Sequence, residues 1–206
     1  MAIVRSSAAC RISFSGGGTD LDPYRSQYGG CVISATIDKF AYCSIITRTD
    51  NLVNIISLDH DLTLKYHIDE KLILDGELDL VKASLNHFNG QIKTGLDIYI
   101  HSDCPKGSGL GGSSALAVAI LGAIIRLLNL DMTKYEIAKL AWKIERTDCG
   151  ISGGLQDQYS AVFGGVNYLE FAKFGDVIVN PLRLDNDIVN ELNYNLIGME
   201  EELIED

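Results

Sequence analysis

A glycine-rich segment, residues 104–114, constrains the fold of this chain more than any other feature. It joins a strand expected at residues 96–101 to a strongly apolar helix expected at residues 113–128. Glycines let the backbone adopt positive φ angles and approach an anion closely. A helix start adds free N–H groups and the positive end of a dipole. In physical terms the segment is a cradle for phosphate.

Three kinds of phosphate loop compete for this segment. A Walker A loop needs Lys and then Ser or Thr after its last glycine, whereas Gly112 is followed by two serines and Lys106 precedes the glycines. The dinucleotide fingerprint G-x-G-x-x-G matches literally, but the capping box at residues 133–136 predicts a second helix where that fold needs a strand. A third pattern, P-x-x-x-G-L-G-[SG]-S-[SA], matches almost throughout. The length of this match disfavours a glycine turn that holds no ligand.

The composition limits the classes of protein to which this chain can belong. The 206 residues are 47% hydrophobic, enough for one sizeable core and part of a second domain. The net charge of −11 disfavours a nucleic-acid surface, which needs clustered positive charge. No apolar run has membrane-spanning length, no signal peptide is expected, and the histidines do not show zinc-site spacing. The five scattered cysteines are expected to be reduced thiols of a cytoplasmic protein.

The order of expected elements favours an α+β fold, with strands early and helices concentrated after residue 113. Strands are expected at residues 4–15, 31–47 (one long strand or two), 53–58, 62–67, 96–101, 166–171 and 177–181, with a possible strand at 194–197. Helices are expected at residues 78–88, 113–128, 133–147, 156–163 and 185–192, and a short helix or turn at 20–28.

Three further carboxylates lie where they can do chemistry. Asp20 follows the glycine turn 16–18 and has room to meet sugar hydroxyls, although composition alone favours an Asx turn or helix cap. Asp157 begins a glycine-flanked helix and can serve as a base or simply stabilise that helix start. Glu145 can ligate Mg²⁺, although a solvated charge is the commoner state of a lone glutamate and the adjacent Arg146 supports that interpretation.

Taken together, these segments resemble the GHMP kinase superfamily, and more narrowly its bacterial heptose 7-phosphate kinase branch, with the related fucose kinases. The resemblance covers about residues 3–197 and rests on the phosphate loop, on Arg-Ile-Ser-Phe at 11–14 with Gly-Gly-Gly-Thr-Asp at 16–20, and on Gly-Gly-Leu-Gln-Asp-Gln-Tyr at 153–159. It implies an N-terminal GHMP kinase domain of the ribosomal protein S5 domain 2-like type over residues 1–180. Residues 181–206 would only begin a ferredoxin-like C-terminal domain, so the chain is expected to be truncated or a fragment.

The resemblance also implies a function. ATP and Mg²⁺ would serve transfer of the γ-phosphoryl group to the anomeric hydroxyl of a heptose 7-phosphate, for sugar-nucleotide synthesis toward surface polysaccharide. L-Fucose, galactose or another small sugar as acceptor, and a nucleotide-binding remnant without catalysis, stay open as alternatives.

Site residues follow from the same resemblance. Asp157 would be the base or an electrostatic partner of the hydroxyl, and Arg11 would keep Asp157 ionised and balance developing charge. Mg²⁺ would be held by Ser113 or Ser114 with Glu145. The sugar would be bound by Gly17, Gly18, Thr19 and Asp20, and the phosphates by Pro105, Lys106, Gly107, Ser108, Gly109, Leu110, Gly111, Gly112, Ser113 and Ser114.

Overall fold

The computed structural model describes residues 1–173 and 175–202, and for residues 197–202 it describes the backbone alone. Seven strands form one sheet in the order β4-β3-β5-β2-β6-β7, with β1 paired to β2. Among the described strands, β3 and β5 form the only parallel pair, and the other pairs are antiparallel. The strands are β1 (Ile3–Ser15), β2 (Gly30–Thr47), β3 (Leu52–Ser57), β4 (Leu62–His67), β5 (Leu96–Ser102), β6 (Val166–Phe171) and β7 (Val177–Pro181).

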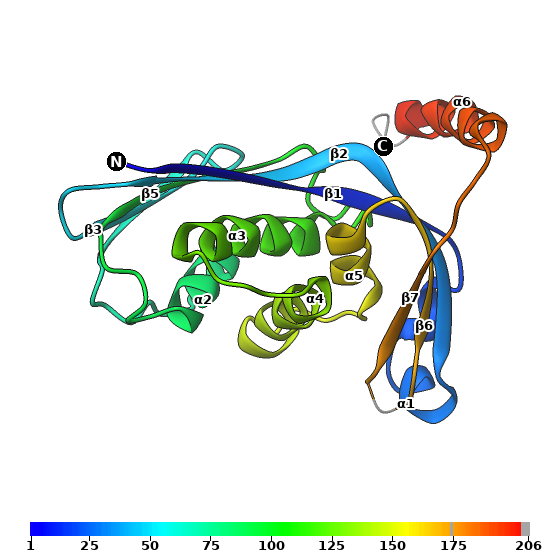
Figure 1. Cartoon of the computed structure of the whole chain (residues 1–206), viewed down its shortest axis with the longest axis horizontal. Helices are drawn as coiled ribbons and strands as arrows, with labels where there is room; N and C mark the ends of the chain where they lie inside the picture. Colours follow the sequence, from blue (N-terminus) through cyan, green and yellow to red (C-terminus); the bar gives the residue numbers. More distant parts are fainter. Residues whose placement is uncertain (174, 203–206) are drawn as a thin grey trace.

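The long strand β2 organises the sheet. Its C-terminal half pairs with β5 from Ala41 to Thr47, and its N-terminal half pairs with β6 from Gly30 to Ala35. The register with β1 shifts between these halves, which is the behaviour of a β-bulge and bends the strand. Figure 1 shows the result, an upper sheet around β5 and β3 and a descending arm formed with β6 and β7.

Helices cover one side of this bent sheet, as Figure 1 shows for α2, α3, α4 and α5. The central helix α3 (Gly112–Leu128) is apolar nearly all round, and Ile120, Leu121 and Ile124 are fully buried against the strands. The others are η1 (Gly17–Asp20), α1 (Tyr24–Tyr28), α2 (Asp79–His87), α4 (Lys134–Trp142), α5 (Gln156–Phe163) and α6 (Asn186–Glu202).

The helix expected at residues 133–147 is present in two parts. The capping box between Thr133 and Glu136 is confirmed and begins α4. After Trp142 the chain continues as a π-helical stretch, η2 (Lys143–Asp148), which contains Glu145. Such wider turns recur at functional sites because they turn side chains out of the regular α-helical rows.

The mixed α+β architecture is confirmed, and residues 31–47 form one strand rather than two. The possible strand at residues 194–197 is wrong, because α6 runs through it. Ile188, Leu192 and Leu196 follow one another at helical spacing, and β7 pairs only with β6, so no described strand offers these residues a partner. Residues 203–206 of the expected second domain lie outside the described residues.

Candidate active site

The phosphate loop connects β5 to α3. Gly107, Gly109 and Gly111 have φ angles of +85°, +72° and +74°, a region that L side chains rarely adopt. Gly111 is the N-cap of α3 and supplies no capping side chain, so the first N–H groups of this buried helix are left for a ligand. The loop therefore has the backbone of an anion cradle.

Arg11 ties this loop to α5. Its backbone N–H donates to the carbonyl of Leu110 at 2.9 Å, and its Nη1 donates to the carbonyl of Gly109 at 2.6 Å. The same guanidinium donates through Nε to Asp157 Oδ1 at 2.8 Å, and both side chains are mostly buried. A Cβ added to Gly111 would lie 3.5 Å from Asp157 Cγ, so the loop directly abuts this carboxylate. The structure thus brings together three predicted parts of the site.

Glu145 is fully buried beside the start of α3. Ser113 Oγ donates to its Oε1 and Ser114 Oγ to its Oε2, each at 2.6 Å, and Gln158 Nε2 donates to Oε2 at 2.6 Å. Ser113 is exposed, whereas Ser114 is fully buried and also accepts from Gln158 at 3.0 Å. The three residues expected at the metal site are therefore in contact, and the π-helical turn places Glu145 inward rather than on a solvated face.

The segment expected to bind sugar lies beside α5, but its members are held differently. Thr19 Oγ1 donates to the carbonyls of Gly16 and Cys31 at 2.8 Å, and Gly17 accepts through its carbonyl from Gln156 Nε2 at 3.2 Å. Gly18 is exposed. Roles of these residues in sugar binding stay predictions.

Asp20 is fully buried, and its Oδ2 accepts from the backbone N–H groups of Leu155 and Gln156 at 2.8 and 2.9 Å. It therefore caps a helix, as the alternative interpretation held, but the helix is α5 rather than the segment that follows Asp20. Burial raises the pKa of Asp20, and these two backbone hydrogen bonds oppose that rise. A direct contact of Asp20 with sugar stays a prediction.

Arg146 is the functional candidate that the sequence did not reveal. Its side chain is mostly buried and points into the site, with Nη2 3.8 Å from Asp157 Oδ2 and Nη1 3.6 Å from Glu145 Oε1. In the sequence, a role for Arg146 was indicated by its position next to Glu145, but that position fitted a solvated charge equally well. Only the fold of the following loop decides the direction of this side chain.

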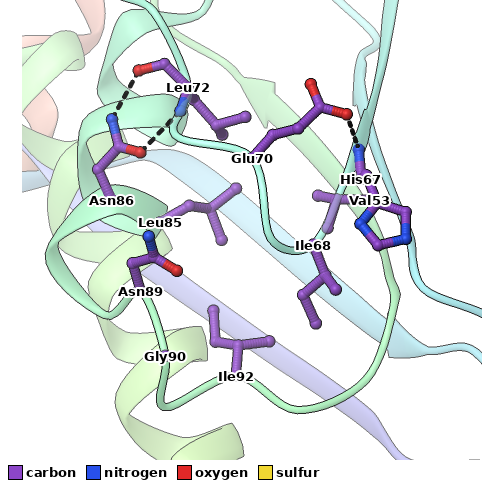
Figure 2. A pocket seen from close by; sticks show the side chains of 10 residues that line it. All are labelled: Val53, His67, Ile68, Glu70, Leu72, Leu85, Asn86, Asn89, Gly90 and Ile92. Atoms are coloured by element: carbon purple, nitrogen blue, oxygen red, sulfur yellow. Dashed lines mark hydrogen bonds between the residues drawn. The ribbon is translucent and has the colours of Figure 1, made fainter.

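A separate pocket lies between β3 and the C-terminal end of α2 (Figure 2). Apolar side chains form much of its lining. The side-chain amide of Asn86 hydrogen-bonds to the backbone N–H and carbonyl of Leu72, and Glu70 accepts from the backbone N–H of His67. None of its lining residues belongs to the phosphate loop or to α5. The pocket is therefore distinct from the candidate site.

Among the described residues, no three or more His, Cys, Asp or Glu side chains form a group that could hold a metal ion by themselves. No helix within them has the length and apolar character needed to cross a membrane.

Residues 79–165 match the family model of the GHMP kinases N terminal domain. With the α+β fold and the phosphate loop, this match shows that the chain contains a GHMP kinase N-terminal domain. The phosphate loop, Glu145 and Asp157 all lie within the matched residues, whereas Arg11 and Asp20 precede them.

Similar proteins of known name indicate which GHMP kinases this chain resembles. The chain is 45% identical over 195 residues to the D-glycero-alpha-D-manno-heptose 7-phosphate kinase of Campylobacter jejuni, covering 93% of this chain and 58% of that protein. It is also similar in structure to a D-glycero-D-manno-heptose 1-phosphate kinase from Bacteroides thetaiotaomicron, with a TM-score of 0.88, 42% identity, and coverage of 93% and 63% of the two chains. Lactococcus lactis galactokinase complexed with galactose aligns with a TM-score of 0.73 at 25% identity, covering 89% and 48%. The chain thus spans about three fifths of the length of the heptose phosphate kinases that it matches.

Proposed function

We propose that this chain supplies the phosphate-binding and catalytic residues of an ATP-dependent kinase that phosphorylates the anomeric hydroxyl of a heptose 7-phosphate. The observation that carries the proposal is the contact between Arg11, the phosphate loop and Asp157. A loop suited to the phosphates of ATP and a carboxylate suited to an acceptor hydroxyl are joined by one guanidinium. The similarity to proteins named as heptose phosphate kinases supports the choice of acceptor.

Asp157 would act on the acceptor hydroxyl through Oδ2. Arg11 occupies Oδ1 with two N–H groups, so Oδ2 is the oxygen left to accept the hydroxyl proton as the hydroxyl oxygen attacks the γ-phosphorus. The leaving ADP oxygen would be stabilised at the phosphate loop. Phosphoryl transfer depends mainly on positioning and charge neutralisation, which these contacts provide in kind.

The residues around Glu145 fit a magnesium ion. Mg²⁺ takes oxygen ligands and commonly binds through one or two carboxylates together with substrate phosphates. Within the described part of the chain Glu145 is fully buried and has one ion-pair partner, Arg146, whose Nη1 lies 3.6 Å from Oε1, beyond hydrogen-bond distance. A bound cation would therefore add a closer counter-charge to this carboxylate. When bound, the ion would neutralise charge on the phosphates. Ser113, exposed at the loop, is better placed to join Glu145 as a ligand than Ser114, whose hydroxyl is enclosed by Glu145 and Gln158.

The test is ADP release from Mg-ATP with and without heptose 7-phosphate, together with identification of the product by phosphorus NMR. We expect acceptor-dependent release that is lost in Asp157→Asn and kept in Asp131→Asn, a matched change at an exposed loop position. ATP should raise the melting temperature of both variants, because the phosphate loop is unchanged.

Three results would revise the proposal. Faster release with L-fucose or galactose would change the acceptor and keep the kinase. Stabilisation by ATP without any phosphotransfer would leave a nucleotide-binding domain that does not catalyse by itself. Undiminished turnover of Asp157→Asn would remove this carboxylate from the mechanism.

A further inference from the structure

The loop that presents Asp157 has no regular secondary structure of its own. Residues 150–155 connect η2 to α5 and contain three glycines. Such a segment loses much conformational freedom when ordered, so its position depends on what its backbone polar groups contact. Two charged side chains from outside the loop meet these groups, one on the carbonyl side and one on the N–H side.

Arg146 holds the carbonyls. Its Nη1 donates to Ser152 at 2.8 Å and to Ile151 at 3.4 Å, and its Nε donates to Gly154 at 3.4 Å. A Cβ added to Gly153 would lie 2.4 Å from Arg146 Cζ, so the loop is wrapped closely around the guanidinium. A planar group with several fixed donors is suited to this task, and the point charge of a lysine is not.

Asp20 holds the N–H groups from the other side. Besides the bonds from Leu155 and Gln156 to Oδ2, its Oδ1 accepts from Gln156 Nε2 at 3.4 Å. A Cβ added to Gly154 would lie 1.9 Å from Asp20 Oδ2, so only glycine permits this approach. Leu155, the N-cap of α5, supplies no side-chain cap, and Asp20 performs that function from a remote part of the chain.

The two contacts converge on Asp157. The N–H groups that Asp20 accepts belong to the two residues directly before Asp157, and Arg146 Nη2 lies 3.8 Å from Asp157 Oδ2. With Arg11 on Oδ1, the carboxylate is thus oriented through its backbone by Asp20 and through its loop by Arg146. Each of the two is mostly or fully buried, so neither is free to move away.

We infer that Asp20 and Arg146 are a pair of positioning residues that clamp the 150–155 loop and the start of α5, and thereby fix the Asp157 carboxylate beside Arg11 and the phosphate loop. This inference rests on the proposed function for its catalytic consequence. It assigns Asp20 an action through another residue, whereas the family resemblance implied direct sugar binding. The two roles make opposite kinetic predictions.

The first experiment separates kcat from KM in Asp20→Asn and Arg146→Lys. For positioning residues we expect kcat to fall on the order of 10- to 100-fold, with the KM for the sugar changed less than about twofold. Asp131→Asn and Arg126→Lys, both at exposed positions, are the matched controls and should keep wild-type values. A large rise in the KM for the sugar with unchanged kcat in Asp20→Asn would show a direct sugar contact and overturn the inference.

The second experiment needs no catalysis. Amide hydrogen exchange should accelerate at Leu155 and Gln156 in Asp20→Asn and across residues 151–157 in Arg146→Lys, while buried amides of α3 keep their protection. Unchanged exchange in the loop would overturn the clamp. If the wild-type chain transfers no phosphate, the proposed function fails, and the exchange measurement still decides whether these two residues hold the loop.

Discussion

Arg11 and Asp157 are 146 residues apart in the sequence, yet Arg11 Nε donates to Asp157 Oδ1 at 2.8 Å. The same arginine contacts the carbonyl of Gly109, so one side chain spans the two halves of the candidate site. The contact joins β1 to α5 across the bend of the sheet. Arg11 therefore links the phosphate loop directly to the proposed base.

Arg11→Lys tests that contact directly. A lysine carries the charge but lacks the fork that reaches both Asp157 and Gly109, so we expect turnover to fall on the order of 100-fold. The melting temperature without ligand should drop only slightly, because the pairing of β1 with β2 and the backbone hydrogen bond from residue 11 to Leu110 are kept. ADP release measures the first effect and thermal unfolding the second, with Arg126→Lys as control. Wild-type turnover in Arg11→Lys would contradict the prediction.

Alanine substitutions of the adjacent Ser113 and Ser114 should affect different properties, magnesium dependence and stability respectively. Ser114→Ala removes two hydrogen bonds from a buried network, one to Glu145 and one from Gln158, which we expect to cost about 1–3 kcal/mol of stability. Ser113→Ala changes an exposed hydroxyl and should keep the stability while raising the Mg²⁺ concentration needed for turnover. Denaturant unfolding and a Mg²⁺ titration of ADP release measure the two. Equal loss of stability in both variants would show that burial does not distinguish them.

Gly154→Ala should destabilise the chain through steric overlap. Its added Cβ would meet Asp20 Oδ2 and Cγ at 1.9 and 2.2 Å, and the overlap should cost about 1–3 kcal/mol through displacement of the loop or of Asp20. Gly18→Ala meets nothing within 4 Å and is the matched control for unfolding free energy. Equal stabilities of the two variants would argue against the close approach of Asp20 to Gly154.

Thiol reactivity should follow burial. Burial raises the pKa of Cys43 to about 12 and that of Cys149 to about 11, so at pH 8 only about one part in 10⁴ of Cys43 and one in 10³ of Cys149 is thiolate. Because the thiolate is the nucleophile, the raised pKa slows alkylation, and the exposed Cys31 should be labelled first by iodoacetamide. Mass spectrometry of tryptic peptides follows each site. Denaturant should equalise the rates, and Cys43 labelled as fast as Cys31 in the native protein would contradict the assignment.

Local patterns predicted much of the fold. The periodicity of residues 113–128, the capping box at Thr133 and the alternation of the early strands each express a backbone preference within a few residues, and the structure confirms them. The possible strand at 194–197 was wrong because two or three apolar residues cannot specify a strand without a neighbouring strand to pair with. The structure adds Arg146 to the candidate site, because its direction depends on a loop that folds back over it.

By itself the sequence determined which segments can hold an anion, start a helix or pair as strands, because glycine conformations, helix caps and hydrophobic periods act over short stretches of chain. Its motifs, recognisable by residue type and order, also predicted the GHMP kinase N-terminal domain that the family model matches. Only the tertiary structure decided that Arg11 meets Asp157, that Ser113 and Ser114 meet Glu145, and that Asp20 caps a helix 135 residues further on. These contacts depend on the bend of β2 and the burial of α3, where packing across the whole sheet selects the partners.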